Sequence, residues 1–508
     1  MINTKQTSVQ EWINEISIGH TQETSFQFIK NSDGSIRWIW PATNKKPVFL
    51  KLYSASSWKA KLYVLLIKTL FLLRLQSLIA KKDIAAFDGF PSDINTDCTR
   101  EWALFTGTVG PNRKMIIAGR DFGNANCFTK IAITNEAKSL VKNEAKALDY
   151  LTSKNLSNTI LPTILSRSEN HIQLSDVSGE KRSNSLTAVH IQSLIEIQET
   201  TRYEGNLSIT PIYRETLDTY RDLSSNTNQA VPKAMKRKLQ WLLNDISEYS
   251  SIELNFAHRD FTPWNCYSDK SSLALYDLEL CKSKLPKGYD AFHFIIQNGI
   301  LVNRSSWTTI YAEIKETICP TFFENDESAM KKYLKFYLLI NTIYYLDIYA
   351  KQDHWHTQIS WLLDTWNDAL SFILGDVNSH RKLVLMDTFD FMQNRKYAAL
   401  KFKGYLPEQI SEFSDVDLCT NQEDAKALTQ YLSEHSLVSI ARTKKLSFMT
   451  NIELVLNNSE LLSVDAIWKL KRKNLVIQDI TELIRSATTN VFGVKQPNSL
   501  AEAEYVNH

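Results

Sequence analysis

The sequence lacks the features that mark several large classes of protein. Its 508 residues include only 14 glycines and 12 prolines, which argues against long disordered or low-complexity segments. The 58 lysines and arginines nearly balance 56 aspartates and glutamates, so the net charge of +2 gives no general attraction to nucleic acid, and we expect no specific nucleic-acid partner. We find no internal repeat. The N-terminus has no charged-then-apolar secretory pattern, and we therefore expect a cytoplasmic protein.

The cysteine pattern excludes two further classes. No two cysteines have C-x-x-C spacing, and none has histidine partners at zinc-finger spacing. The sequence therefore predicts reduced thiols rather than a disulfide framework or a structural zinc site. The six cysteines are Cys98, Cys127, Cys266, Cys281, Cys319 and Cys419.

No uncharged stretch is long enough to span a membrane. Residues 59–82 are strongly apolar, but Lys68 and Arg74 interrupt them, and a spanning helix needs roughly 18 or more apolar residues. One interpretation is a single helix that is buried or half-buried in a globular domain. The alternative is an interfacial helix in peripheral contact with an anionic membrane. The lysines that flank it are Lys59, Lys61, Lys81 and Lys82.

The chain length predicts about three domains at roughly 150 residues each, preceded here by an N-terminal region. Residues 1–97 mix strands with the apolar helix and carry no catalytic pattern, so their role is open. The strands include PVFLKLY, residues 47–53, and a pair that Asp33-Gly34 is expected to join as a hairpin turn. Short strands and one helix follow in residues 98–182, and residues 183–378 are mainly helical. Residues 379–508 alternate helices and strands, ending in a predicted helix over 463–474, which is typical of a small α/β domain.

The strongest chemical pattern is AHRDFTPWNCYSDKSSLALYDLELC, residues 257–281. Phosphoryl transfer consists mostly of positioning and charge neutralisation, so it needs a carboxylate near the attacking hydroxyl and oxygen ligands for magnesium. Asp260 meets the first requirement, and Asn265 brings an amide oxygen from the same tight loop. Asp277 supplies a carboxylate at the end of the next strand, and Glu279 would face the same side to reach a second ion.

HRDFTPWN followed by YDLE resembles the catalytic and metal loops of aminoglycoside phosphotransferases and choline kinases, which share the protein-kinase fold. The resemblance implies ATP and Mg²⁺ as cofactors, Asp260 as the catalytic residue, and a small-molecule hydroxyl as acceptor. Arg259 stands where these small-molecule kinases have glycine, which is closer to protein kinases and leaves the acceptor class open. The absence of an evident Ala-Pro-Glu segment downstream speaks against a protein kinase.

The same family needs an N-terminal lobe, and residues 98–182 offer one. Lys130, in the strand CFTKIAI, would reach the phosphates, and Glu144 on the following helix would hold it by an ion pair. Gly107 and Gly110 would form the loop over the phosphates. Lys51 competes for the role of Lys130, but the long apolar helix after it has no central acid.

Two nearby patterns receive structural interpretations. Asp121-Phe122-Gly123 matches the protein-kinase metal motif by letters, but it precedes Lys130 and is better explained as a hairpin turn. His258, just before Asp260, is usually a buried structural residue in this family.

The C-terminal region carries a second acidic pattern. Asp415 and Asp417 alternate on a predicted strand, which places them on one face about 7 Å apart, where a metal can bridge them. With Gly404 in the preceding turn, the pattern resembles a nucleotidyltransferase fold of the polymerase-beta type. It departs from that family at Tyr405, where glycine or serine is usual, and at Glu453, the candidate third acid, where aspartate is usual. The alternative is an acidic strand end without catalysis.

These patterns together predict an α+β protein with a two-lobed kinase-like domain, an N-terminal α/β extension and a small C-terminal nucleotidyltransferase-like domain. The predicted function is ATP-dependent phosphorylation of a hydroxyl on a sugar, amino alcohol or aminoglycoside-like molecule. Adjacency of the two activities suggests one pathway, in which a phosphorylated product is then activated with a nucleotide. The alternatives are a pseudokinase or regulatory protein, an antibiotic-modifying enzyme, and a membrane-associated protein of a glycan or lipid pathway. The pattern leaves the oligomeric state open.

Overall fold

The chain is a mixed α/β protein that divides into two compact units. The first unit comprises Met1–Thr201 with Phe256–Ser283, and the second comprises Arg202–Asn255 with Lys284–His508. Gly404 and Tyr405 lie outside the residues that the structure describes. The computed structural model describes residues 8–31, 33–53, 58–108, 110, 112–178, 182–246, 251–269, 271–352, 354–402, 406–472, 475–478, 480–498 and 502.

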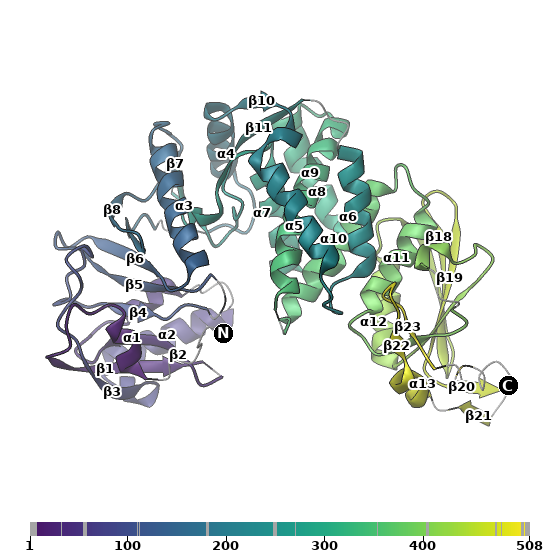
Figure 1. Ribbon diagram of the computed structural model, residues 1–508, viewed down its shortest axis with the longest axis horizontal. Coiled ribbons are helices and arrows are strands. Elements are labelled where there is room, and N and C mark those ends of the chain that lie inside the picture. Colours follow the sequence, from purple (N-terminus) through teal and green to yellow (C-terminus); the bar gives the residue numbers. More distant parts are fainter. Residues whose placement is uncertain are drawn as a thin grey trace. The chain divides into compact units, whose positions relative to one another are not determined.

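The first unit is built on one eight-stranded sheet, in the order β3-β1-β2-β4-β5-β6-β9-β8 (Figure 1). All neighbouring strands in it are antiparallel. The predicted extension, residues 1–97, contributes three of these strands and is therefore continuous with the predicted N-terminal lobe. The strands are β1 (Glu23–Lys30), β2 (Ile36–Pro41), β3 (Lys81–Ala86), β4 (Ala103–Phe105), β5 (Lys114–Arg120), β6 (Asn126–Ala132), β8 (Ile164–Arg167) and β9 (His171–Ser175).

Two predicted hairpin turns are confirmed. Gly34 has a φ of +87°, and its N–H donates to Asn31 O at 3.1 Å, which closes the β1–β2 turn. Such a positive φ favours glycine, as the Asp-Gly pair predicted. Asp121 lies in the turn between β5 and β6, where its carboxylate accepts the Ala125 N–H at 2.8 Å. The Asp-Phe-Gly tripeptide is thus a turn and not a metal loop.

Both faces of the sheet carry an apolar layer. On one face, Trp12 and Ile13 of α1 (Val9–Asn14) join a core that includes Phe26 and Trp102. On the other face, α2 (Trp58–Leu72) and the 3₁₀ helix η1 (Val48–Leu52) cover Trp38 and Trp40. The sequence predicted a strand around Lys51. Phe49 instead folds back within η1 and stacks on Trp40, with ring centroids 4.8 Å apart.

The apolar helix ends at Leu72, ten residues before the end of the predicted helix at residue 82. The Leu75 N–H donates to Leu70 O at 2.8 Å and the Arg74 N–H donates to Phe71 O at 3.1 Å, while Arg74 has a φ of +59°. These are the bonds of a Schellman termination, which satisfies the last helical carbonyls. The chain then returns through η2 (Gln76–Leu78) into β3. Within the described residues, no helix is both long and apolar enough to cross a bilayer.

The remaining elements of the first unit surround the residues of the phosphotransfer motif. Helix α3 follows β6 and contacts it, as Figure 1 shows. Thr134 caps its first turn by accepting the Ala137 N–H at 3.1 Å. A small sheet in the order β12-β13-β7 holds the motif's loop. These elements are α3 (Asn135–Thr152), β7 (Thr159–Ile160), α4 (Ala188–Thr200), β12 (Cys266–Ser268), β13 (Leu273–Leu275) and the 3₁₀ helix η4 (Leu278–Leu280).

The second unit combines a helical bundle with a five-stranded sheet in the order β15-β16-β19-β18-β17. Helix α11 contacts α6 and α10 on one side and α12 on the other. The α-helices of the second unit are α5 (Pro211–Ser225), α6 (Lys233–Ile246), α7 (Tyr289–Asn298), α8 (Trp307–Phe323), α9 (Glu327–Ala350), α10 (Thr357–Leu374), α11 (His380–Met392), α12 (Gln422–Ser433) and α13 (Ile480–Ser486). Its shorter helical segments are η3 (Leu207–Ile209), η5 (Gly299–Asn303) and η6 (Pro407–Gln409). The five strands are β15 (Tyr397–Ala399), β16 (Val416–Thr420), β17 (Val438–Lys445), β18 (Met449–Leu456) and β19 (Leu461–Ile467). Short strands are β10 (Tyr203–Gly205), β11 (Ile252–Ala257), β14 (Lys282–Pro286), β20 (Leu470–Arg472), β21 (Leu475–Gln478), β22 (Thr488–Thr489) and β23 (Lys495–Gln496).

The predicted helix over residues 463–474 is wrong. Residues 461–467 form strand β19, which pairs in parallel with β16 and antiparallel with β18. Leu462, Val464 and Ala466 are buried while their neighbours are more exposed, so the burial has the two-residue period of a strand. Because β19 lies between β16 and β18, Asp465 of β19 is the acidic residue beside Asp417 of β16.

Candidate active site

Lys130 is held between two carboxylates. Its Nζ lies 2.8 Å from both Glu144 carboxylate oxygens and 2.6 Å from Asp277 Oδ1. Strand β6 presents Lys130 on the face opposite Ile131, and α3 presents Glu144, whose side chain is fully buried. The contact between Lys130 and Glu144 that the sequence predicted is therefore present, while their roles toward a nucleotide stay predictions.

The electrostatics keep this cluster ionised. Burial lowers the pKa of Lys130, but the carboxylates of Asp277 and Glu144 outweigh it, so the pKa lies above its ordinary value. Burial raises the pKa of Asp277, but the ammonium groups of Lys130 and Lys114 outweigh it and hold the pKa well below its ordinary value. The site thus fixes opposite charges in a partly buried place, where they interact more strongly than in water.

Lys114 and Glu279 complete the cluster. Lys114, on β5, forms an ion pair with Glu279, and burial lowers the pKa of Lys114 to about 8. Sequence reasoning missed Lys114, although the hairpin register supplies a signal. Ile116 pairs with Lys130, so the residue two before Ile116 lies on the same face of the sheet.

The carboxylates of this cluster fit a divalent cation. Single oxygens of Glu144, Asp277 and Glu279 lie within 4.8 Å of one another. Asn143 fixes the segment that carries Glu279, because its Nδ2 donates to Glu279 O at 2.7 Å and to Cys281 O at 3.0 Å. Hard carboxylate oxygens are the ligands that Mg²⁺ prefers, and the predicted metal residues Asp277 and Glu279 are both in this group.

A tight loop positions Asp260. Asn265 Nδ2 donates to Asp260 Oδ2 at 2.8 Å and to Asp260 O at 3.0 Å. His258 Nε2 donates to Tyr276 O at 2.7 Å, and its Nδ1 accepts the Asp260 N–H at 3.3 Å. His258 is buried and ties this loop to the segment before Asp277, as the sequence predicted. With the Asn265 nitrogen committed to Asp260, Oδ1 is the side-chain atom that can accept a cation.

Arg259 takes the conformation that a glycine would take. Its φ is +66°, and the residue is buried. A left-handed conformation costs a non-glycine residue about 1–2 kcal/mol, and this loop adopts it with a buried arginine.

Gly107 and Gly110 lie in the turn between β4 and β5. Gly107 has a φ of +79°, and a Cβ added there would lie 2.1 Å from Lys114 O. Only glycine fits this approach. A Cβ on Gly110 would meet nothing within 4 Å. The competing Lys51 lies on η1 and donates to Asn126 Oδ1 at 2.6 Å, whereas Lys130 contacts both carboxylates.

The acidic pattern of the second unit has a different third member from the predicted one. Asp417 on β16 pairs in register with Asp465 on β19, and Lys401 Nζ lies 3.1 Å from Asp417 Oδ2. Asp415 precedes β16. Burial raises the pKa of Asp465, and the nearby carboxylates of Asp417 and Asp415 raise it further. A hydrogen bond from Asn451 of β18 lowers the pKa but does not offset these effects. Glu453 is exposed on β18, which is separated from β16 by β19, so the acidic residue directly beside Asp417 is Asp465 and not the predicted Glu453.

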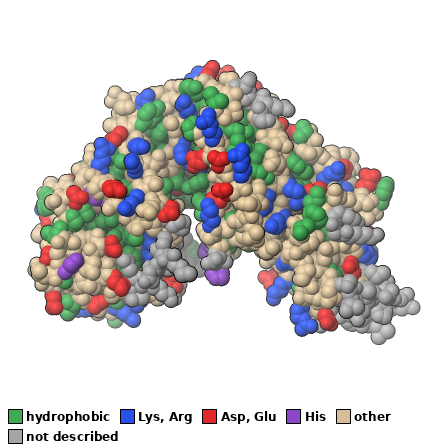
Figure 2. All heavy atoms as spheres, viewed as in Figure 1, with side chains coloured by type: hydrophobic (Ala, Val, Ile, Leu, Met, Phe, Trp, Pro, Cys, Tyr) green, Lys and Arg blue, Asp and Glu red, His purple; other side chains and the backbone are tan. Residues whose placement is uncertain are grey.

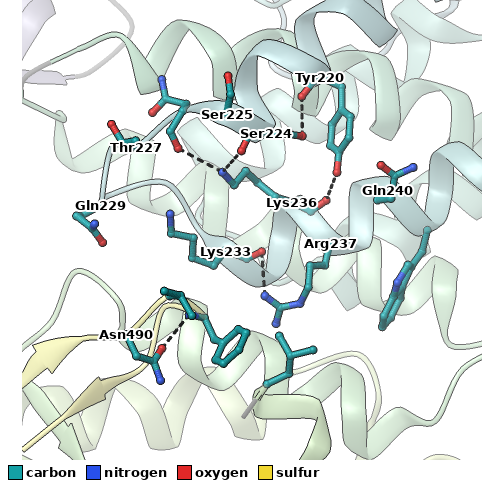
Figure 3. Close-up of a pocket in the computed structure, with 15 residues that line it drawn as sticks. Tyr220, Ser224, Ser225, Thr227, Gln229, Lys233, Lys236, Arg237, Gln240 and Asn490 are labelled. Atoms are coloured by element: carbon teal, nitrogen blue, oxygen red, sulfur yellow. Dashed lines mark hydrogen bonds between the residues drawn. The ribbon is translucent and has the colours of Figure 1, made fainter. Parts of the chain in front are cut away.

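A separate cavity of about 710 Å³ lies within the second unit (Figure 3). Its cations are Lys233, Lys236 and Arg237. Lys236 Nζ donates to carbonyls at the end of α5, including Ser224 O at 3.4 Å, and Arg237 forms a two-pronged pair with Glu408 at 2.8 Å. Hydrogen bonds within the protein thus engage two of the three cations, and we assign this cavity no ligand.

Comparison with known proteins gives distant likenesses. No family model matches the chain, and no curated protein matches it. An ethanolamine kinase from Plasmodium vivax is 12% identical, with 62% of this chain and 90% of that chain covered and a TM-score of 0.36. A choline/ethanolamine kinase family protein from Mesorhizobium loti is 11% identical over 56% and 92%, with a TM-score of 0.36. The complex of APH(2″)-IIa with streptomycin and ATP is 14% identical over 51% and 93%, with a TM-score of 0.34. At these scores, a functional conclusion has to rest on the geometry of the site.

Proposed function

We propose that the protein is an ATP-dependent phosphotransferase that acts on a hydroxyl group of a small molecule. The observation that carries the proposal is the ammonium of Lys130 between Glu144 and Asp277, at 2.8 and 2.6 Å. A structural ion pair needs only one acid for each base. Here the partly buried Lys130 contacts two carboxylates, with a third carboxylate and a second lysine beside it. Such a cluster can exchange internal contacts for phosphate and metal contacts without leaving a buried charge unpaired.

Each residue then has a definite role. Asp260, oriented by the Asn265 amide, orients the acceptor hydroxyl and takes its proton. Lys130 neutralises phosphate charge, and Glu144 holds its position. Asn265, Asp277 and Glu279 are the residues that would hold Mg²⁺, which offsets the charge of the transferred phosphoryl group. Gly107 gives the loop between β4 and β5 its close approach to Lys114, and with Gly110 this loop would cover the phosphates.

Phosphoryl transfer itself is the first test. The full-length protein is screened with ATP and Mg²⁺ against sugars, amino alcohols and aminoglycosides, with ATP consumption as the readout. We expect Asp260→Asn to lower kcat by about 10²- to 10⁴-fold, the usual contribution of a positioned general base. Asp121→Asn, in the β5–β6 turn, is the matched control and keeps full activity.

The outcomes separate the alternatives. Turnover that is unchanged in Asp260→Asn would refute the proposal. ATP binding by thermal shift without turnover of any acceptor would favour a pseudokinase or regulatory protein instead. Turnover of aminoglycosides alone would identify an antibiotic-modifying enzyme.

We also propose that the C-terminal α/β region is nucleotidyltransferase-like. The supporting observation is the parallel register of β16 and β19, which puts Asp465 directly beside Asp417. Asp415 precedes Asp417 by two residues. Adjacent carboxylates on one sheet face suit a metal that carries nucleotide phosphates. Joined to the kinase-like site, this activity would attach a nucleotide to the phosphorylated product within one pathway.

A further inference from the structure

Large hydrophobic side chains are exposed in unusual number on and just after α2. Ten of the 22 that the described part of the chain exposes lie between residues 58 and 84. Monomeric proteins rarely leave so many large apolar side chains of one segment open to water unless the segment binds something. The ten are Trp58, Leu62, Tyr63, Leu65, Leu66, Leu72, Leu73, Leu75, Leu78 and Ile84, and we call this surface the α2 patch.

The fold explains why these side chains face outward. The inner face of α2 packs Ile67 and Phe71 against the sheet, with Phe71 lying 6.0 Å from Trp40 between ring centroids. At 100° per residue, Leu65 and Leu72 fall on the opposite side of the helix. They are 62% and 82% exposed. The helix therefore has two apolar faces, of which the sheet covers only one.

The charges around the α2 patch are predominantly positive. Residues 58–84 contain six lysines and arginines and one acidic residue, Asp83. Lys61 and Lys68, seven residues apart, are exposed along one edge of the helix, and Arg74, Lys81 and Lys82 are exposed after its end. Elsewhere the charges are mixed: Figure 2 shows lysine and arginine interspersed with aspartate and glutamate on the visible face. The cationic rim is thus a local property of this segment.

We propose that the α2 patch binds the surface of an anionic lipid bilayer, with α2 lying in the plane of the interface. Leucines on one face, a tryptophan at the end of the helix and lysines at the rim are the composition of interfacial helices. The leucines would enter the acyl boundary while the lysines and Arg74 contact anionic headgroups.

A second copy of the chain is a poorer occupant. A two-fold interface places the same surface of both copies together, so the cationic rims would lie against each other. Such juxtaposed like charges oppose association. A partner helix would need acidic residues to match the rim, and the exposed aliphatic side chains offer it no hydrogen-bonding group for specificity. An anionic bilayer satisfies both the apolar face and the charges.

Vesicle binding by the full-length protein tests the proposal. Flotation is measured with vesicles of phosphatidylcholine alone and of phosphatidylcholine with phosphatidylserine, at low and high salt. We expect binding only to the anionic vesicles, weakened by salt. Lys61→Gln/Lys68→Gln should reduce partitioning about 25-fold, at about fivefold per charge. Leu65→Glu/Leu72→Glu should reduce it more than about 100-fold.

The control is Leu461→Glu, at a leucine of β19 that is 65% exposed outside the α2 patch, and it should bind like the parent. All the altered side chains are exposed, and circular dichroism checks that each variant is folded. The proposal is overturned if the parent fails to float with anionic vesicles, or if it binds neutral vesicles equally well. It is also overturned if sedimentation shows a dimer that Leu65→Glu/Leu72→Glu dissociates while vesicle binding is absent. Loss of phosphotransfer activity would not bear on it.

Discussion

Lys238 offers the sharpest test of how the second unit is held together. This lysine of α6 is fully buried and contacts Asp387 of α11, which is also fully buried. Its Nζ also donates to Asn367 O at 3.0 Å, to Asn367 Oδ1 at 2.6 Å and to Ser371 Oγ at 2.9 Å, both residues of α10. One ammonium group therefore joins three helices, and Lys238→Met removes it while keeping most of the side-chain volume.

The cost follows from the groups that are left behind. Breaking a buried ion pair by removing one partner costs about 3–5 kcal/mol, because the other charge stays uncompensated. Asp387 retains a hydrogen bond from Ser371 at 2.5 Å and a contact with His435 at 2.9 Å. The pKa of His435 is raised, because Asp368 and Asp387 outweigh the effect of burial, so it remains a partial counter-charge. We therefore expect a loss of about 3 kcal/mol for Lys238→Met, at the lower end of that range.

Urea unfolding followed by circular dichroism gives the free energy of unfolding of each variant. Hydrogen exchange on peptides of α6, α10 and α11 shows which of these helices lose stability. Lys351→Met is the control, because Lys351 is 66% exposed and pairs with Asp347 one turn away. That change should cost no more than about 0.5 kcal/mol. Lys238→Met combined with Asp387→Leu should recover most of the stability, since neither charge is then buried. A loss below about 1 kcal/mol for Lys238→Met alone would refute the reasoning.

Two further predictions concern titration and the second acidic site. Burial lowers the pKa of His190 to about 4. Between about pH 4 and 6.5 the unfolded chain therefore binds more protons than the folded chain. Up to about 3 kcal/mol of the free energy of unfolding is consequently lost as the pH falls through that window. His190→Gln, which can still accept the Thr187 N–H, should abolish this loss in pH-dependent urea unfolding, whereas the exposed His20→Gln should not. Asp465→Asn should abolish magnesium-dependent pyrophosphate release from nucleoside triphosphates. It should also raise the free energy of unfolding, because it removes a half-buried carboxylate that the carboxylates of Asp417 and Asp415 repel. Glu453→Gln should change neither quantity. Retained release in Asp465→Asn would contradict that assignment.

Local patterns predicted several elements of the first unit, including two that contribute to the candidate active site. The strand around Lys130, the helix that carries Glu144 and the turn at Gly34 each follow from periodicity or turn chemistry within a few residues. The contact between Lys130 and Glu144 followed because a strand and the next helix usually pack together. Lys114 was missed because its place depends on the register between two strands, which no single segment reveals.

Tertiary context decided the segments that were predicted wrongly. Residues 463–467 are SVDAI, and pairing on both sides with β16 and β18 makes them a strand. One hydrophobic core spans the predicted boundary at residue 378 and joins Ala234 and Leu374 to α11, while the domain division itself stays a prediction. Helix α11 is buried on every side, so its sequence shows no polar face from which its position could be deduced.

The sheet register connects the α2 patch with the candidate active site. Trp38 of β2 pairs with Phe105 of β4, Phe105 pairs with Ile116 of β5, and Ile116 pairs with Lys130 of β6. Directly paired residues project from the same face of a sheet, so this row runs from the core beneath α2 to the lysine of the site, about 15 Å away at the usual strand spacing. The N-terminal strands therefore belong to the same rigid sheet as Lys130. A bilayer bound at the α2 patch would consequently lie on the same side of this sheet as Lys130.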